Sequence, residues 1–156
     1  MGNPWLKLGG FLSLAVALLH AVIIFIGAPA YRYFGAGEDM AAAAESGSAL
    51  PALITLILAA MFAIWGLYAF SGSGVIRRLP LLKIALIIIG SIYTLRGVAV
   101  FLQLFQIAIS SSNVPAREVV FSVVSLFIGL AYLIGTATRW RSLSTSGKEG
   151  KYGAKV

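Results

Sequence analysis

Arg96 is the residue whose chemistry stands out most, because it lies within the long apolar run 81–109. A guanidinium stays ionised in proteins and carries five N–H donors, so it needs acceptors around it. A charged residue at the centre of a membrane span costs from about 3 to more than 10 kcal/mol and is by default a functional candidate. We expect a buried Arg96 that anchors an anion. The alternative is a structural arginine that donates hydrogen bonds to carbonyl groups and to Gln103.

Counting residues from the ends of the apolar runs places Arg96 and His20 near the midplane of the membrane and further polar side chains in its outer half, which predicts a polar pocket that opens outward. In the run 81–109, Tyr93, Arg96 and Gln103 share one arc at helical spacing. The single histidine, His20, also suits a hydrogen bond between two helices, which is the favoured interpretation for it. The predicted ligand-binding residues are Arg96, His20, Gln103, Tyr93, Ser125 and Thr55.

Small and hydroxyl residues form a stripe along the last apolar run. They recur at offsets of three and four, at Ser122, Ser125, Gly129, Tyr132 and Thr136. Lipid gives no reason to align such residues, so the stripe predicts a face that turns toward another helix. Because small and hydroxyl residues commonly let membrane helices approach closely, we interpret the stripe first as a packing face.

None of the acidic residues lies inside the four apolar runs, so a partner for Arg96 has to come from elsewhere. Glu118 precedes the last run and lies about 15 Å from Arg96 by helix rise. Three other acids fall in the connection 29–50. We expect Glu38 or Asp39 to come close to Arg96, with a small polar pocket between them. If the connection 29–50 stays outside the helix bundle, we expect a bound anion, instead of a carboxylate of this connection, beside Arg96.

The sequence offers little for catalysis or for cofactors. It contains no Gly-rich phosphate loop, no Ser–His–Asp set and no pair of carboxylates within the apolar runs. There is no cysteine, and a single histidine cannot make a typical zinc or bis-histidine haem site within one chain. Haem ligation through His20 would require two copies. We expect no catalytic residue, no metal and no cofactor, and the sequence leans away from an enzyme.

Composition indicates which elements position these residues. The chain has 156 residues, of which 60% are hydrophobic and 11% charged, with a mean hydropathy of +0.95. Soluble domains carry about 25% charged residues, so membrane spans are the natural interpretation. About 20 helical residues cross a bilayer core. We predict an all-α, polytopic four-helix transmembrane bundle, with helices at about 9–28, 51–70, 81–109 and 119–138. The first apolar run is longer than a typical signal-peptide core, so we expect it to be a retained helix.

The charges and connections predict an orientation. Nine basic residues flank one side of the predicted membrane domain, against Arg32 and Arg117 on the other. This bias places both termini in the cytoplasm, and the segment 71–80 forms a tight turn there. In the first outer connection, "EDMAAAAES" predicts a short helix that ends near Gly47. We expect a transmembrane domain over 1–143 and a flexible basic tail over 144–156.

Two classes of function follow from this arrangement. The first is a small integral membrane protein that binds or transports an anionic or amphipathic, lipid-like ligand from the outer face. The second is a non-catalytic accessory or assembly subunit, docked on a larger membrane complex or on copies of itself. The expected location is the plasma membrane, in bacteria the inner membrane. The expected partners are membrane lipids and not nucleic acid, because the basic tail is short and no basic folded surface is predicted.

Overall fold

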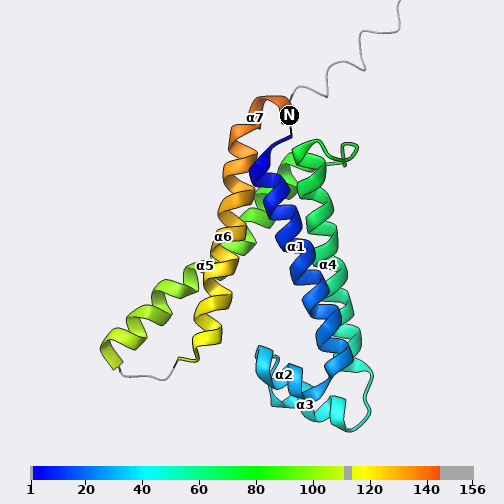
Figure 1. The fold of residues 1–156 in the computed structure, drawn as a ribbon, viewed down its shortest axis with the longest axis vertical. Coiled ribbons are helices and arrows are strands. Elements are labelled where there is room, and N and C mark those ends of the chain that lie inside the picture. Colours follow the sequence, from blue (N-terminus) through cyan, green and yellow to red (C-terminus); the bar gives the residue numbers. More distant parts are fainter. Residues whose placement is uncertain (1, 111–113, 145–156) are drawn as a thin grey trace, which may run out of the picture. The chain divides into compact units, whose positions relative to one another are not determined.

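The computed structural model describes residues 2–110 and 114–144, which form helices and connections with no strand among them. The predicted tail lies outside these residues from position 145 onward. The helices are α1 (Pro4–Ile26), α2 (Ala28–Phe34), α3 (Glu38–Glu45), α4 (Leu50–Ser73), α5 (Leu82–Ser110), α6 (Ala116–Thr138) and α7 (Trp140–Ser144), as Figure 1 shows. The all-helical class and the short helix predicted before the second apolar run are confirmed.

Four of these helices, α1, α4, α5 and α6, are long and apolar enough to cross a membrane. In their most apolar stretches, between 22% and 39% of the residues are buried inside the protein. Most of the apolar surface is therefore left for lipid or for another protein to cover. The predicted number of candidate spans is confirmed, and each observed span contains most of its predicted run.

The chain divides into two compact units. The first unit combines the residues up to Gly10 with those from Leu67 onward, so it holds the start of α1, the end of α4, and α5, α6 and α7. The second unit is Phe11–Gly66, which contains the rest of α1 and α4 together with α2 and α3.

Within the first unit, α5 and α6 cross where glycines replace side chains. A Cβ added at Gly97 would overlap the backbone of Leu126, and one at Gly129 would lie 2.5 Å from the backbone nitrogen of Thr94. The two helix backbones therefore touch at this crossing, as small residues permit in membrane helices. Beyond the crossing, α5 diverges from α6 (Figure 1), and its apolar side chains from Phe101 to Ile109 are exposed.

Asn3 ties the start of α1 to the end of α6, also within the first unit. Its Oδ1 accepts the Leu6 N–H at 3.1 Å, which makes Asn3 the N-cap of the helix that begins at Pro4. Its Nδ2 donates to the Gly135 carbonyl at 3.0 Å and to Thr138 Oγ1 at 2.8 Å. Because Asn3 is buried, these bonds hold the two helix ends together out of contact with water.

In the second unit, two short helices follow α1. Gly27 interrupts the chain with a φ of 75°, and α2 begins directly after it. A small apolar core forms around the buried ring of Tyr31 and the fully buried Ala41 of α3. The predicted stop at Gly47 is confirmed, since it adopts a φ of 81° immediately after the last turn of α3.

Candidate functional site

Arg96 lies on α5 one residue before the glycine crossing, and its side chain is exposed rather than buried as the sequence suggested. The tight approach at Gly97 explains this difference, because two backbones in contact leave no interior space for a guanidinium. Arg96 Nη1 donates one long hydrogen bond, 3.5 Å, to the fully buried Ser122 Oγ on α6. A single hydroxyl satisfies a small part of the donor capacity of a guanidinium.

Gln103 follows Arg96 by seven residues and therefore lies two turns further along a similar face of α5. Among the described residues, its Oε1 is a buried side-chain oxygen without a hydrogen-bond partner. A buried acceptor that lacks a donor costs about 1–3 kcal/mol. The sequence placed Gln103 on the same arc as Arg96, and the structure adds that Gln103 Oε1 is buried without a hydrogen-bond donor.

Tyr93 and Ser125 belong to the same unit but serve its packing. The Tyr93 side chain is 5% exposed, and its ring lies 6.0 Å from that of Tyr132 between centroids. Ser125 Oγ donates to the Phe121 carbonyl at 2.8 Å, four residues earlier in its own helix. The Tyr93 ring thus packs between α5 and α6, and the Ser125 hydroxyl is satisfied within α6. The predicted role of both residues in ligand binding stays a prediction.

His20 and Thr55 belong to the second unit, whereas the other predicted ligand-binding residues belong to the first. His20 Nδ1 lies 2.8 Å from the Val16 carbonyl of its own helix, so this ring nitrogen has a hydrogen-bond partner within α1. Its ring packs 4.9 Å from that of Phe62 on α4. The buried Thr55 donates to the Pro51 carbonyl at 2.8 Å and lies 3.5 Å from the Tyr31 hydroxyl. Local contacts thus account for both side chains.

The stripe of small and hydroxyl residues on α6 serves mainly as a packing face. Thr136, like Ser125, donates to the carbonyl four residues before it, at 2.7 Å, and on α5 Thr94 does the same toward Gly90. Such bonds satisfy a hydroxyl inside its own helix without a ligand. Ser122 is different, because its hydroxyl accepts a hydrogen bond from Arg96 on the neighbouring helix.

The acidic residues predicted to approach Arg96 have another setting. Arg32 of α2 forms ion pairs of 2.7 Å with both Glu38 and Glu45 of α3. Glu38 therefore pairs with Arg32, six residues earlier in the sequence, whereas we expected it to lie close to Arg96. The hydrogen bonds from Arg32 lower the pKa of both glutamates below their usual range and raise the pKa of Arg32 itself. For Asp39, proximity to Arg96 stays a prediction.

Sequence reasoning assigned Ser122 to a stripe and not to the candidate site. Arg96 contacts Ser122, and Glu118 lies one turn before Ser122, about 6 Å along α6. This separation along the helix is shorter than the distance of about 15 Å expected between Glu118 and Arg96. No ion pair joins Arg96 and Glu118 among the described residues. The candidate site is therefore the face of α5 and α6 formed by Arg96, Gln103 and Ser122.

Comparison of the chain with protein families, with curated proteins and with solved structures finds no match. Its function is therefore inferred from the chemistry and geometry of its own residues.

Proposed function

We propose that the protein is an integral membrane protein that binds an anionic amphipathic ligand, with Arg96 as the anchor of its head group. The observation that carries this proposal is the exposed guanidinium of Arg96 within an apolar span, held by one 3.5 Å hydrogen bond to a neutral hydroxyl. Its charge lacks an acidic partner in the described residues around it. An anionic head group would supply both the charge and the acceptors.

Gln103 supports the same proposal from a second direction. Its buried Oε1 accepts no hydrogen bond in the described structure, and a hydroxyl or amide donor of a ligand would satisfy it. A ligand with an anionic group and a donor group meets the needs of both Arg96 and Gln103. An alkyl chain suits the remaining surface, because the neighbouring part of α5 exposes Phe101 and Phe105.

The test compares ligand binding by Arg96 variants, with dodecyl phosphate as the anionic probe and dodecyltrimethylammonium as the cationic control. A charge-assisted hydrogen bond contributes about 1.5–3 kcal/mol, so Arg96→Gln should weaken dodecyl phosphate binding by about tenfold to a hundredfold, measured by isothermal titration calorimetry. Arg96→Lys should bind with intermediate affinity because it keeps the charge but loses the planar fork of donors. Arg117→Gln, which removes one charge at the start of α6, is the matched control.

Preserved binding in a well-folded Arg96→Gln variant would reject the anchor role. Equal loss in Arg117→Gln would show that net charge, rather than a site at Arg96, controls the affinity. If Arg96→Gln fails to fold while Arg96→Lys folds but binds no probe, Arg96 is a structural residue.

A second candidate function is that of an accessory or assembly subunit. The observation in its favour is the length of α5 beyond Gly97, where Leu102, Phe105 and Ile109 are each more than 60% exposed. The chain has no cysteine, so a single Phe105→Cys substitution can report a neighbour by crosslinking in the membrane. Specific crosslinks to a second copy or to one other protein would favour assembly, and their absence would favour lipid contact.

A further inference from the structure

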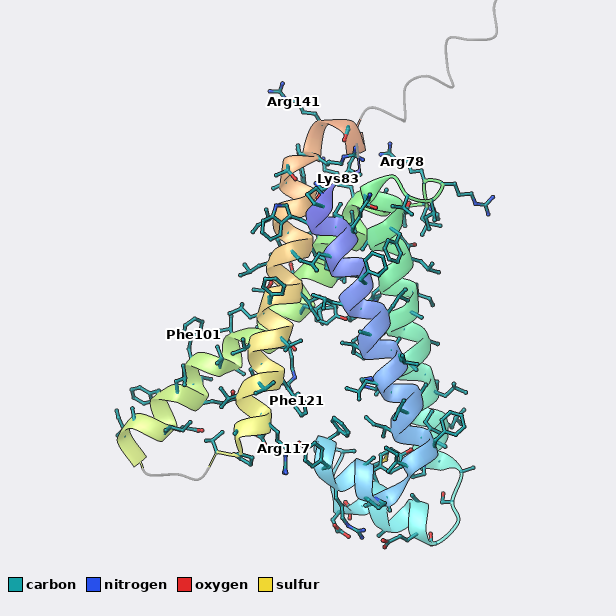
Figure 2. All side chains as sticks on the ribbon, viewed as in Figure 1. Arg78, Lys83, Phe101, Arg117, Phe121 and Arg141 are labelled. Atoms are coloured by element: carbon teal, nitrogen blue, oxygen red, sulfur yellow. The ribbon has the colours of Figure 1, made fainter. Side chains whose placement is uncertain are left out.

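Basic residues gather at the end of the first unit that carries Asn3, and this cluster differs from the site around Arg96. Figure 2 shows Arg78, Lys83 and Arg141 at this end. The described basic residues here are Lys7, Arg77, Arg78, Lys83, Arg139 and Arg141. Among the described residues of the first unit, Glu118 is the one acidic residue, and it stands at the opposite end of α6.

Segments far apart in the sequence meet in this cluster. Arg78, in the turn between α4 and α5, donates to the carbonyls of Ser142 at 3.4 Å and of Leu143, at the end of α7. Lys83 Nζ lies 3.1 Å from the centre of the Trp140 ring. These contacts hold the turn against α7, although the two segments lie about 60 residues apart in the sequence. The neighbouring residues Arg77 and Arg141 therefore lie at the same end of the first unit.

The acceptors that receive hydrogen bonds from Arg78 and Arg139 are neutral carbonyl groups. Arg139 donates to the carbonyls of Gly72 and Ser73 at 3.5 and 3.4 Å, at the end of α4. Like the carbonyls that receive Arg78, these acceptors are neutral. Helix carbonyl ends carry only partial negative charge, so these hydrogen bonds leave Arg78 and Arg139 positively charged. Arg77 and Arg141 are both exposed at this end of the unit.

We propose that the rim of this end, formed by Arg77, Arg78, Lys83 and Arg141, binds the phosphate head group of an anionic phospholipid. The complementary charge identifies the occupant, since the phosphodiester is the acidic group available at a membrane surface. Trp140 is 48% exposed beside Lys83, as is typical of a residue at the level of the lipid head groups. A planar guanidinium suits bidentate contact with phosphate, and each basic residue near an anionic membrane surface contributes roughly a fivefold gain in affinity.

The test measures 1:1 lipid complexes of the full chain by native mass spectrometry, with palmitoyl-oleoyl phosphatidylglycerol against the corresponding phosphatidylcholine. The unmodified protein should bind phosphatidylglycerol with a Kd at least tenfold lower. Arg77→Gln and Arg141→Gln should each weaken it about fivefold, and the double variant should approach the phosphatidylcholine value. Arg77→Lys and Arg141→Lys together should retain most of the preference, because they keep both charges.

Two controls separate this rim from general charge and from the proposed ligand site. Arg117→Gln removes one charge at the other end of α6 and should change the phosphatidylglycerol Kd by less than twofold. Because phosphatidylglycerol is itself an anionic amphiphile that suits the proposed site at Arg96, the double rim variant is also measured in an Arg96→Gln background, where it should weaken phosphatidylglycerol binding by the same factor as in the unmodified protein. Equal affinity for the two lipids, or an unchanged preference in the double variant, would overturn the proposal. A loss in Arg117→Gln as large as in Arg77→Gln would overturn it too, since it would assign the preference to net charge.

Discussion

The hydrogen bonds of Asn3 predict a large effect from the loss of one small side chain near the amino terminus. Asn3→Ala removes the N-cap bond to the Leu6 N–H and both bonds donated toward α6, to the Gly135 carbonyl and to Thr138 Oγ1. Loss of an N-cap costs about 1 kcal/mol, and each of the two other buried bonds contributes about 1 kcal/mol. We expect the free energy of unfolding to fall by about 3 kcal/mol.

Two matched variants divide this effect into its parts. Asn3→Ser keeps a good N-cap oxygen but cannot replace the bonds that Nδ2 donates, so it should cost about 2 kcal/mol. Thr138→Val removes the bond from Asn3 and the bond that Thr138 Oγ1 donates to the Gly135 carbonyl, with little change in volume, and should cost about 1–2 kcal/mol. The assay is reversible unfolding of the detergent-solubilised protein by increasing fractions of sodium dodecyl sulfate, followed by tryptophan fluorescence.

The order of the three variants in free energy of unfolding tests whether the Asn3 contacts stabilise the fold. If Asn3→Ser is as stable as the unmodified protein, the bonds to α6 contribute nothing and Asn3 acts only as a helix cap. If Asn3→Ala loses less than about 0.5 kcal/mol, which is the range of ordinary surface substitutions, neither contact stabilises the fold.

Two further predictions concern the glycine crossing and the ion pairs of α2 and α3. Gly97→Ala should lower the free energy of unfolding by about 1–3 kcal/mol, because the added Cβ overlaps the α6 backbone. At an open helical site the same change would stabilise the helix by up to about 1 kcal/mol. A higher free energy of unfolding in the variant would therefore refute the contact. The lowered pKa values of Glu38 and Glu45 predict a stabilisation that is complete above the ordinary glutamate pKa of 4.5 and is lost as the pH falls through the lowered values. Circular dichroism of the folded protein on acid titration should show this loss, and Glu38→Gln with Glu45→Gln should abolish it while Arg32 stays charged.

The four candidate spans could be predicted because length and composition are local properties of the sequence. The ends were harder to predict, since α1 begins at Pro4 and not at residue 9. The signal for this start was present in Asn3 and Pro4, an N-cap followed by proline at the first helical position. The short α2 was missed because it depends on the left-handed backbone of Gly27 and on the burial of Tyr31 against α3, which are tertiary properties.

The contacts of the candidate site could not be predicted in the same way. Arg96 meets Ser122 because Gly97 and Gly129 fix the register of α5 against α6, and the register of two helices is not visible in either helix alone. The pairing of Arg32 with Glu38 depends on the bend between α2 and α3, where Gly35 and Gly37 both adopt positive φ. Sequence spacing placed Arg96 and Gln103 on one arc of a helix, but it carries no information about which residues of another helix they meet.

The position of Asn3 also constrains the order in which the protein is completed during synthesis. Asn3 is made before its acceptors Gly135 and Thr138, which follow 132 and 135 residues later. At about 5–20 residues per second, the ribosome needs roughly 7–26 s to reach them. The cap of α1 can form as soon as Leu6 has been made, but the bonds to α6 have to wait until Gly135 and Thr138 have been made. Asn3 thus leaves the ribosome long before the residues that complete its contacts.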